Sequence, residues 1–235
     1  YFPQLHYFNR AINSDVFVIL DCAQYTKALV HNVNDKKERH KSYQSDTVLK
    51  FPDGEHYLTV SVKHNGLLPI NQTVLDYSSD WARRHAATIA STYGKSSNFT
   101  EVFPSIENLL KKNYKTLGEL NTASFLWGLS RLMGLHIDVN DLSVETINRY
   151  LQSSNFRLKK IVLGSEFGGP RPEGIQKGTE WTVAICKALG ATEYLHGETA
   201  QNGYMDDEYY RENNIALVTQ SWKCKEYQQQ FNDKV

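Results

Sequence analysis

The sequence predicts an α/β fold with a Rossmann-like, mostly parallel sheet and a helical subdomain or insertion. Residues 16–20 and 158–163 form short apolar runs that have the length and composition of buried strands. Strand and helix patterns alternate twice near the C-terminal end, as in units whose parallel strands are joined by helices. Residues 99–155 show helical patterns and no convincing strand, which predicts the helical part.

The N-terminal part begins with an aromatic segment that runs into a short helix at residues 9–12 and then into the first strand. Residues 30–50 are polar and charged, which favours a solvated loop or insertion; a phosphate-binding patch is the alternative interpretation. Residues 57–62 alternate in polarity and predict a half-buried strand. Pro69 restricts residues 68–75 to an edge strand or a loop.

Capping residues, periodic apolar positions and terminal glycines predict the helices. Asp80 and Gly94 bracket one helix, and Thr179 and Gly190 bracket another. The predicted helices cover residues 81–93, 99–113, 116–133, 143–151, 180–189 and 206–213. The last two predicted strands cover residues 192–195 and 215–219, and residues 168–174 form a loop rich in Gly and Pro that suits a lid.

These elements predict a division of the chain into three parts. Residues 1–98 and residues 156–235 form the two halves of one α/β domain, and residues 99–155 form the helical subdomain between them. A chain of 235 residues is long enough to bury one sizeable core.

Charge and cysteine content limit the partners. The 26 Lys and Arg residues balance 26 Asp and Glu residues, so no overall field attracts the chain to nucleic acid or to an anionic membrane. No apolar stretch approaches the roughly 20 residues of a membrane-spanning helix. The three cysteines show no C-x-x-C spacing, which argues against a disulfide scaffold or zinc site and favours the cytoplasm. No metal site is predicted.

Polar side chains follow the predicted strands at their carboxyl ends. They are Asp21, Gln24, Lys27, Ser165, Glu166, His196 and Gln220. If the sheet is parallel, these ends lie along one edge, where open α/β sheets bind ligands. Each residue taken singly is more often a solvated loop residue, so their convergence carries the prediction. Cys22 is either a nucleophile at a strand end or a buried small hydrophobe.

Several blocks of residues resemble one known family. They are the aromatic segment 1–8, the D-x-F-V-x-x-D-x-x-Q-Y-x-K block at 15–27, the pair Asn32 and Asn34, the L-T-V-x-V strand at 58–62, the W-x-x-x-H helix at Trp81 and His85, and the I-C-K-x-L-G-A-x-x-Y-L-x-G block at 185–197, followed by Tyr204 and Asp206. Together they resemble the WbqC-like proteins along nearly the whole chain. The departures are His6, His196 and a long charged insertion at residues 35–46.

The resemblance implies a cytoplasmic α/β protein of surface-polysaccharide biosynthesis. Its expected reaction transfers an aminoacyl group, for example glycyl, to the amine of a nucleotide-linked amino sugar. The expected partners are therefore that nucleotide-linked amino sugar and a small amino acid or its activated form. Such a reaction needs a base for the amine, donors for the developing oxyanion and cations for the diphosphate.

The resemblance and the residue chemistry together assign roles. Asp21 or His85 is the expected base, Gln24 or Asn32 the oxyanion donor, and Lys27 the diphosphate ligand. The catalytic residues predicted from this are Asp21, His85 and Gln24. The predicted substrate-binding residues are Tyr7, Tyr25, Lys27, Asn32, Asn34, Ser165, His196, Tyr204 and Gln220.

Two other functions stay open at this point. One is a nucleotidyl- or adenylate-forming enzyme on a Rossmann-like sheet, for which ATP with magnesium would be the cofactor. The other is a non-catalytic protein that binds sugar nucleotides or carbohydrate, for which the 14 tyrosines and 4 tryptophans offer stacking surfaces. A homo-oligomer is compatible with either, and the sequence does not set the oligomeric state.

Overall fold

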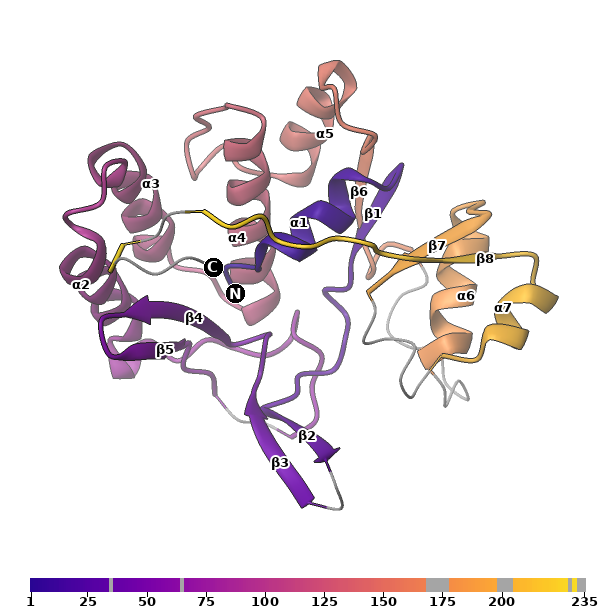
Figure 1. Ribbon diagram of the computed structural model, residues 1–235, viewed down its shortest axis with the longest axis horizontal. Coiled ribbons are helices and arrows are strands. Elements are labelled where there is room, and N and C mark those ends of the chain that lie inside the picture. The colour runs from indigo at the N-terminus through magenta and orange to yellow at the C-terminus, as the bar shows by residue number, and fades with distance from the viewer. Residues whose placement is uncertain (34–35, 64–65, 168–177, 198–204, 228–229, 232–235) are drawn as a thin grey trace. The chain divides into compact units, whose positions relative to one another are not determined.

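The structure is a computed structural model that describes residues 1–33, 36–63, 66–167, 178–197, 205–227 and 230–231, with residues 28–33 and 36–40 described as backbone only. The chain divides into two compact units, and Figure 1 labels their helices and strands. Unit 1 consists of Tyr1–Pro3, Gln24–Ser143 and Lys225–Val235, and unit 2 consists of Gln4–Ala23 and Val144–Cys224. Both units are therefore assembled from segments that are distant in the sequence. The predicted three-part division stays a prediction.

Unit 1 contains two antiparallel hairpins followed by helices. Its described elements are β2 (Ala28–Val33), β3 (Lys36–Lys41), β4 (Asp46–Phe51), β5 (Gly54–Thr59), the 3-10 helix η1 (Tyr77–Ser79), α2 (Trp81–Tyr93), α3 (Phe99–Lys111) and α4 (Leu117–Leu132). Strand β2 pairs with β3 from Ala28 opposite Lys41 to Val33 opposite Lys36, and β4 pairs with β5 from Asp46 opposite Thr59 to Phe51 opposite Gly54.

The loop predicted at residues 30–50 is wrong, because these residues form most of β2, β3 and β4. The strands were missed because their charged composition lacks the apolar pattern of a strand. Cross-strand pairing satisfies the backbone N–H and C=O groups whether or not the side chains are apolar. Pro52, Asp53 and Gly54 have the composition of a turn, and Gly54 has a φ of +128°, a backbone conformation that would be strained in a residue with a side chain. Residues 68–75 form only isolated bridges, among them Val62 with Leu75.

The core of unit 1 gathers the apolar faces of its helices. Trp81, Leu109, Leu117 and Leu120 are almost completely buried in one cluster. Helix α4 begins against the turn at 69–73, where a side chain at Gly118 would lie 2.9 Å from Cα of Asn71. Glycine is therefore needed there for the backbone to approach so closely.

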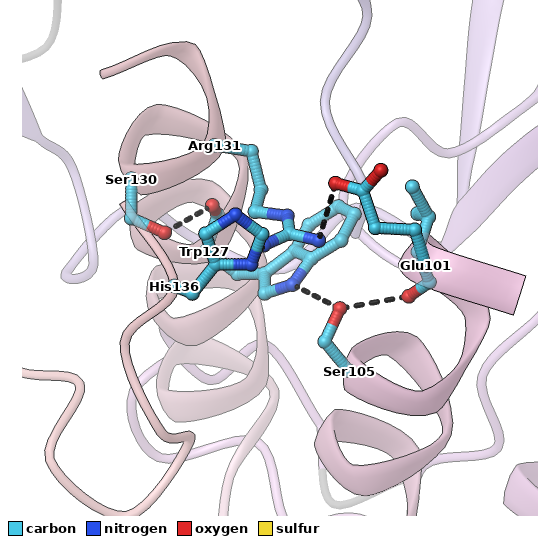
Figure 2. Close-up of polar contacts among 7 residues, drawn as sticks. Glu101, Ser105, Trp127, Ser130, Arg131 and His136 are labelled. Atoms are coloured by element: carbon cyan, nitrogen blue, oxygen red, sulfur yellow. Dashed lines mark hydrogen bonds and ion pairs between the residues drawn. The ribbon is translucent and has the colours of Figure 1, made fainter. Parts of the chain in front are cut away.

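Polar side chains tie α3 to the second half of α4 (Figure 2). The indole N–H of Trp127 donates to Oγ of Ser105 at 3.1 Å. Arg131 contacts both the carboxylate of Glu101, at 4.0 Å, and Nδ1 of His136. Because these groups satisfy one another, the interface needs no ligand to explain its polarity.

Unit 2 combines short parallel strands with helices. Its described elements are α1 (Leu5–Ile12), β1 (Val16–Ile19), α5 (Val144–Ser153), β6 (Lys160–Leu163), α6 (Gly178–Ala188), β7 (Glu193–His196), α7 (Asp207–Glu212) and β8 (Ala216–Thr219). Strand β1 pairs in parallel with β6, and β7 pairs in parallel with β8. The two predicted buried strands are thus neighbours, although they are about 140 residues apart in the sequence.

The mixture of helices and short parallel ladders is compatible with the predicted α/β class, and the Rossmann-like sheet is not confirmed. The described strands pair in four two-stranded ladders, of which two are parallel and two antiparallel. Strand β1 was predicted to be buried on both faces, but only Phe17 and Ile19 are buried. Thr179, predicted as a cap, lies inside α6 and is buried. The predicted lid at 168–174 lies outside the described residues.

None of the helices in the described residues combines the length and the apolar composition that crossing a membrane would require.

Candidate functional site

The carboxyl ends of β1 and β6 bring Asp21 and Ser165 into contact. The backbone N–H of Ser165 donates to Oδ1 of Asp21 at 2.9 Å, and its hydroxyl donates to Oδ2 at 2.6 Å. Parallel pairing is the cause, because Asp21 follows β1 and Ser165 follows β6 at the same edge. The predicted convergence of these two residues is therefore present in the structure.

The two partners differ in exposure. Asp21 is only 7% exposed, whereas Ser165 lies at the surface. A side chain at Gly164 would lie 3.2 Å from Sγ of Cys22, so glycine lets the loop after β6 approach the end of β1. Burial and the neighbouring Asp21 raise the pKa of the Cys22 thiol, which disfavours the thiolate that a nucleophile needs. Cys22 therefore fits the buried small hydrophobe.

A second polar cluster lies at the carboxyl ends of β7 and β8. Gln220 directly follows β8, and its backbone N–H donates to the carbonyl of His196 at 2.7 Å. The side-chain Oε1 of Gln220 accepts from Nε and Nη2 of Arg10, both at 3.3 Å. His196 is buried, and its Nδ1 lies 3.0 Å from the carbonyl of Gly197. Two predicted substrate-binding residues thus meet here, together with one residue that was not predicted.

Tyr7 belongs to the same unit but packs on its core. Its ring meets Phe17 edge-on, with 5.3 Å between centroids. Burial raises the pKa of its hydroxyl, while the charge of Arg10 lowers it. Tyr7 is therefore partly a packing residue of α1 against β1.

His85 lies in unit 1 within an aromatic enclosure. Its Nδ1 is 2.9 Å from the hydroxyl of Tyr1, and its ring centroid is 5.3 Å from that of Trp81. Burial lowers the pKa of His85 to about 4, against a weaker raising effect of a hydrogen bond to the backbone of Thr59. The imidazole is therefore neutral at pH 7 and engaged inside the unit.

Tyr25 and Gln24 hold together the loops of unit 1. The hydroxyl of Tyr25 donates to Oγ of Ser45 at 3.2 Å, and burial raises its pKa. The side chain of Gln24 is exposed, while its backbone carbonyl accepts from the amide of Gln44 at 3.0 Å. Lys27 is exposed.

The remaining predicted residues are not described as side chains. Asn32 lies in β2, where its backbone pairs with Lys37. Asn34 and Tyr204 lie outside the described residues. The roles assigned to all these residues stay predictions, and the structure adds contacts only within each unit.

Two residues were missed by the sequence argument. Arg10 lies on α1, where only its spacing of four residues from His6 indicated a shared helix face. Asp46 is buried in unit 1 and accepts hydrogen bonds from Ser45 and from Thr59. It lay within the segment predicted to be a solvated loop, so no local signal marked it.

Unit 1 also contains an apolar cavity of about 370 Å³ between its second hairpin and helices α2 and α3. Leu49, Leu58, Ile89 and Phe103 are among its walls. Among the predicted site residues whose side chains the structure describes, none lines it. Across the residues that the structure describes, no group of three or more His, Cys, Asp or Glu side chains is placed to hold a metal ion.

The model of the WbqC-like protein family matches residues 1–234. The chain is also similar to an uncharacterised protein, Rv1507c, of Mycobacterium tuberculosis (strain ATCC 25618 / H37Rv), with 24% identity over 221 residues that cover 93% of this chain and 77% of that protein. No solved structure matches the chain.

Proposed function

The chain belongs to the WbqC-like protein family, and we propose that it is a cytoplasmic transferase of surface-polysaccharide biosynthesis. It attaches an aminoacyl group, such as glycyl, to the amine of a nucleotide-linked amino sugar. The observation that carries the proposal is the pair of hydrogen bonds between Asp21 and Ser165 at the carboxyl ends of two parallel strands. The same pairing supports a Rossmann-like interpretation of unit 2.

The reaction forms an amide bond. The amine nitrogen attacks the carbonyl carbon of the activated aminoacyl donor, the bond to the activating group breaks with its electron pair, and the amine loses a proton. Asp21 is the base that receives this proton. Because Asp21 is buried and Ser165 is exposed, the proton passes through the Ser165 hydroxyl, whose Oγ lies 2.6 Å from Oδ2.

The other roles come from the sequence and remain part of the proposal. Gln24 or Asn32 would stabilise the oxyanion, and Lys27 would bind the diphosphate. His85 is the weaker candidate for the base, because its ring is buried and already bonded to Tyr1.

Two variants test the role of Asp21. Purified protein would be incubated with UDP- and dTDP-linked amino sugars, with glycine plus ATP and magnesium or with a glycyl thioester as donor. Mass spectrometry would then follow the gain of one glycyl residue. We expect Asp21→Asn to reduce turnover by about 100-fold or more, since a base is lost. Ser165→Ala should also reduce it, because the proton path is interrupted.

Asp207→Asn is the matched control, because it makes the same change at an exposed carboxylate on α7 of the same unit. It should leave turnover unchanged, and thermal melting would show that each variant is folded. Full turnover in folded Asp21→Asn would overturn the assignment of the base. Binding of the nucleotide-linked sugar with no turnover from any donor would overturn the transferase and favour a binding protein.

A further inference from the structure

Arg10 is held at the carboxyl end of the β7–β8 pair by a neutral side chain. Nε and Nη2 of its guanidinium both donate to Oε1 of Gln220 at 3.3 Å. Gln220 follows β8 and Gly197 follows β7, so the guanidinium lies where parallel strands end. This is the edge at which open α/β sheets bind ligands.

Gln220 is fixed in the orientation that it presents to Arg10. It is 8% exposed, and its Nε2 donates to the carbonyl of His6 and to Oδ1 of Asn9, both at 2.8 Å. Since both amide hydrogens are used by acceptors on α1, Oε1 must face Arg10. The side-chain amide of Gln220 is therefore a hydrogen-bond acceptor of fixed orientation for the guanidinium.

Gly197 leaves the space that the guanidinium occupies. A Cβ atom at this position would lie 2.6 Å from Nη2 of Arg10. Any other residue there would displace the end of the arginine side chain. The position of the Arg10 guanidinium therefore depends on glycine at the residue that follows β7.

The charge of Arg10 is not neutralised by the described part of the chain. No described carboxylate forms an ion pair with it, and Nη1 has no hydrogen-bond partner there. The pKa of His6 is lowered mainly by burial and, to a smaller extent, by the positive charge of Arg10. A half-buried guanidinium whose hydrogen-bond acceptor is an uncharged amide keeps its positive charge available to attract an anion.

We propose that Arg10 and His6, four residues apart on one face of α1, form a subsite for a phosphate group of a nucleotide. Guanidinium groups bind phosphate oxygens through paired N–H donors, and the exposed imidazole of His6 adds a second donor. The subsite rests on the proposed function in that it would hold the diphosphate of the nucleotide-linked sugar. Arg10 is thus an alternative to Lys27 as the ligand of the diphosphate.

Calorimetric titration of the full-length chain tests the subsite without any turnover. The probes are UDP, inorganic pyrophosphate and uridine, with acetate added to detect a site for carboxylates. We expect UDP and pyrophosphate to bind with an affinity that falls as salt is added, and uridine and acetate to bind much more weakly. Arg10→Gln should weaken UDP binding by about tenfold or more, as the loss of a charged hydrogen-bond donor does.

Gln220→Glu provides a second variant that keeps Arg10. It places a carboxylate against the guanidinium and should weaken UDP binding in the same way. Arg149→Gln is the control, because Arg149 is an exposed arginine on α5 of the same unit. It should bind UDP like the unchanged protein. Circular dichroism and melting curves would show that the three variants are folded.

Several results would overturn the subsite. They are equal UDP affinity in folded Arg10→Gln, equal binding of UDP and uridine, or acetate binding that competes with UDP at similar concentration. Its failure is separable from that of the transferase. Arg10-dependent UDP binding with no aminoacyl transfer would support the subsite and contradict the transferase. Unchanged transfer and unchanged KM in Arg10→Gln would support the transferase and contradict the subsite.

Discussion

His85, which the sequence predicts to be catalytic, is a buried residue that affects the stability of unit 1. It is 6% exposed, it bonds to the hydroxyl of Tyr1, and its ring packs against Trp81. Burial lowers its pKa from 6.5 to about 4. In the folded protein this histidine stays neutral down to about pH 4, whereas in the unfolded chain it takes a proton near pH 6.5.

The pH dependence of stability follows from this shift. Between pH 6.5 and about 4 the unfolded chain protonates His85 and the folded chain does not, so the free energy of unfolding falls as the pH falls. The full loss is up to about 3 kcal/mol. We expect His85→Gln to flatten this dependence, measured by urea unfolding at pH 7 and pH 5.

His56→Gln makes the same change at an exposed histidine of unit 1. It should keep the acid-induced loss of the unchanged protein. If His85→Gln lost stability toward pH 5 as steeply as the unchanged protein, the shifted pKa of His85 would not be the cause.

At the scale of elements, α5 completes the pairing of β6. The side chain of Asn148 donates to the carbonyl of Ile161 at 2.9 Å and accepts from its backbone N–H at 2.7 Å. The backbone N–H and C=O of Ile161 are thus both hydrogen-bonded to the side chain of Asn148. On this edge of β6 the amide takes the place of a neighbouring strand. Ile161 is buried, so these groups have little access to water.

Removal of this amide should weaken the β1–β6 pair. We expect Asn148→Ala to lower the free energy of unfolding by about 1–3 kcal/mol, because two backbone groups lose their partners at a buried position. Chemical denaturation measures the change. Arg149→Ala, at the exposed next position of the same helix, should change stability by no more than about 0.5 kcal/mol. Equal stability of the Asn148 variant and the unchanged protein would show that water replaces the amide.

At the scale of the whole molecule, unit 1 interrupts the sequence of unit 2 between Ala23 and Val144. Each unit has buried apolar residues of its own, such as Leu120 in unit 1 and Val183 in unit 2. Compact units of this kind commonly open as separate cooperative bodies. The strands that carry Asp21 and Ser165 then depend on the stability of unit 2.

Hydrogen exchange tests this independence. In Asn148→Ala we expect faster exchange of the backbone amides of β1 and β6, with exchange in α3 and α4 unchanged. Mass spectrometry of peptic fragments resolves these segments. An equal acceleration in α4 would mean that the two units open together, as one cooperative body.

Local patterns in the sequence were sufficient for most helices and for the paired apolar strands. The helix at 81–93 has its predicted limits, and its buried residues Trp81, Ala86 and Ile89 recur at helical spacing. Even so, Asp80 does not cap it: φ is +51° and its carboxylate bonds to Arg83 instead. The predicted meeting of Asp21 and Ser165 also held, since parallel pairing places equivalent strand ends together.

The sequence by itself was enough for the family and the apolar strands, and it predicted an α/β class with which the structure is compatible, because apolar periodicity is a property of neighbouring residues. Only the tertiary structure decided that the charged segment forms hairpins, that His85 is enclosed, and that Arg10 meets Gln220 across 210 residues. Strand partners, burial and the field around a charge depend on which distant residues come together. No local pattern encodes those contacts.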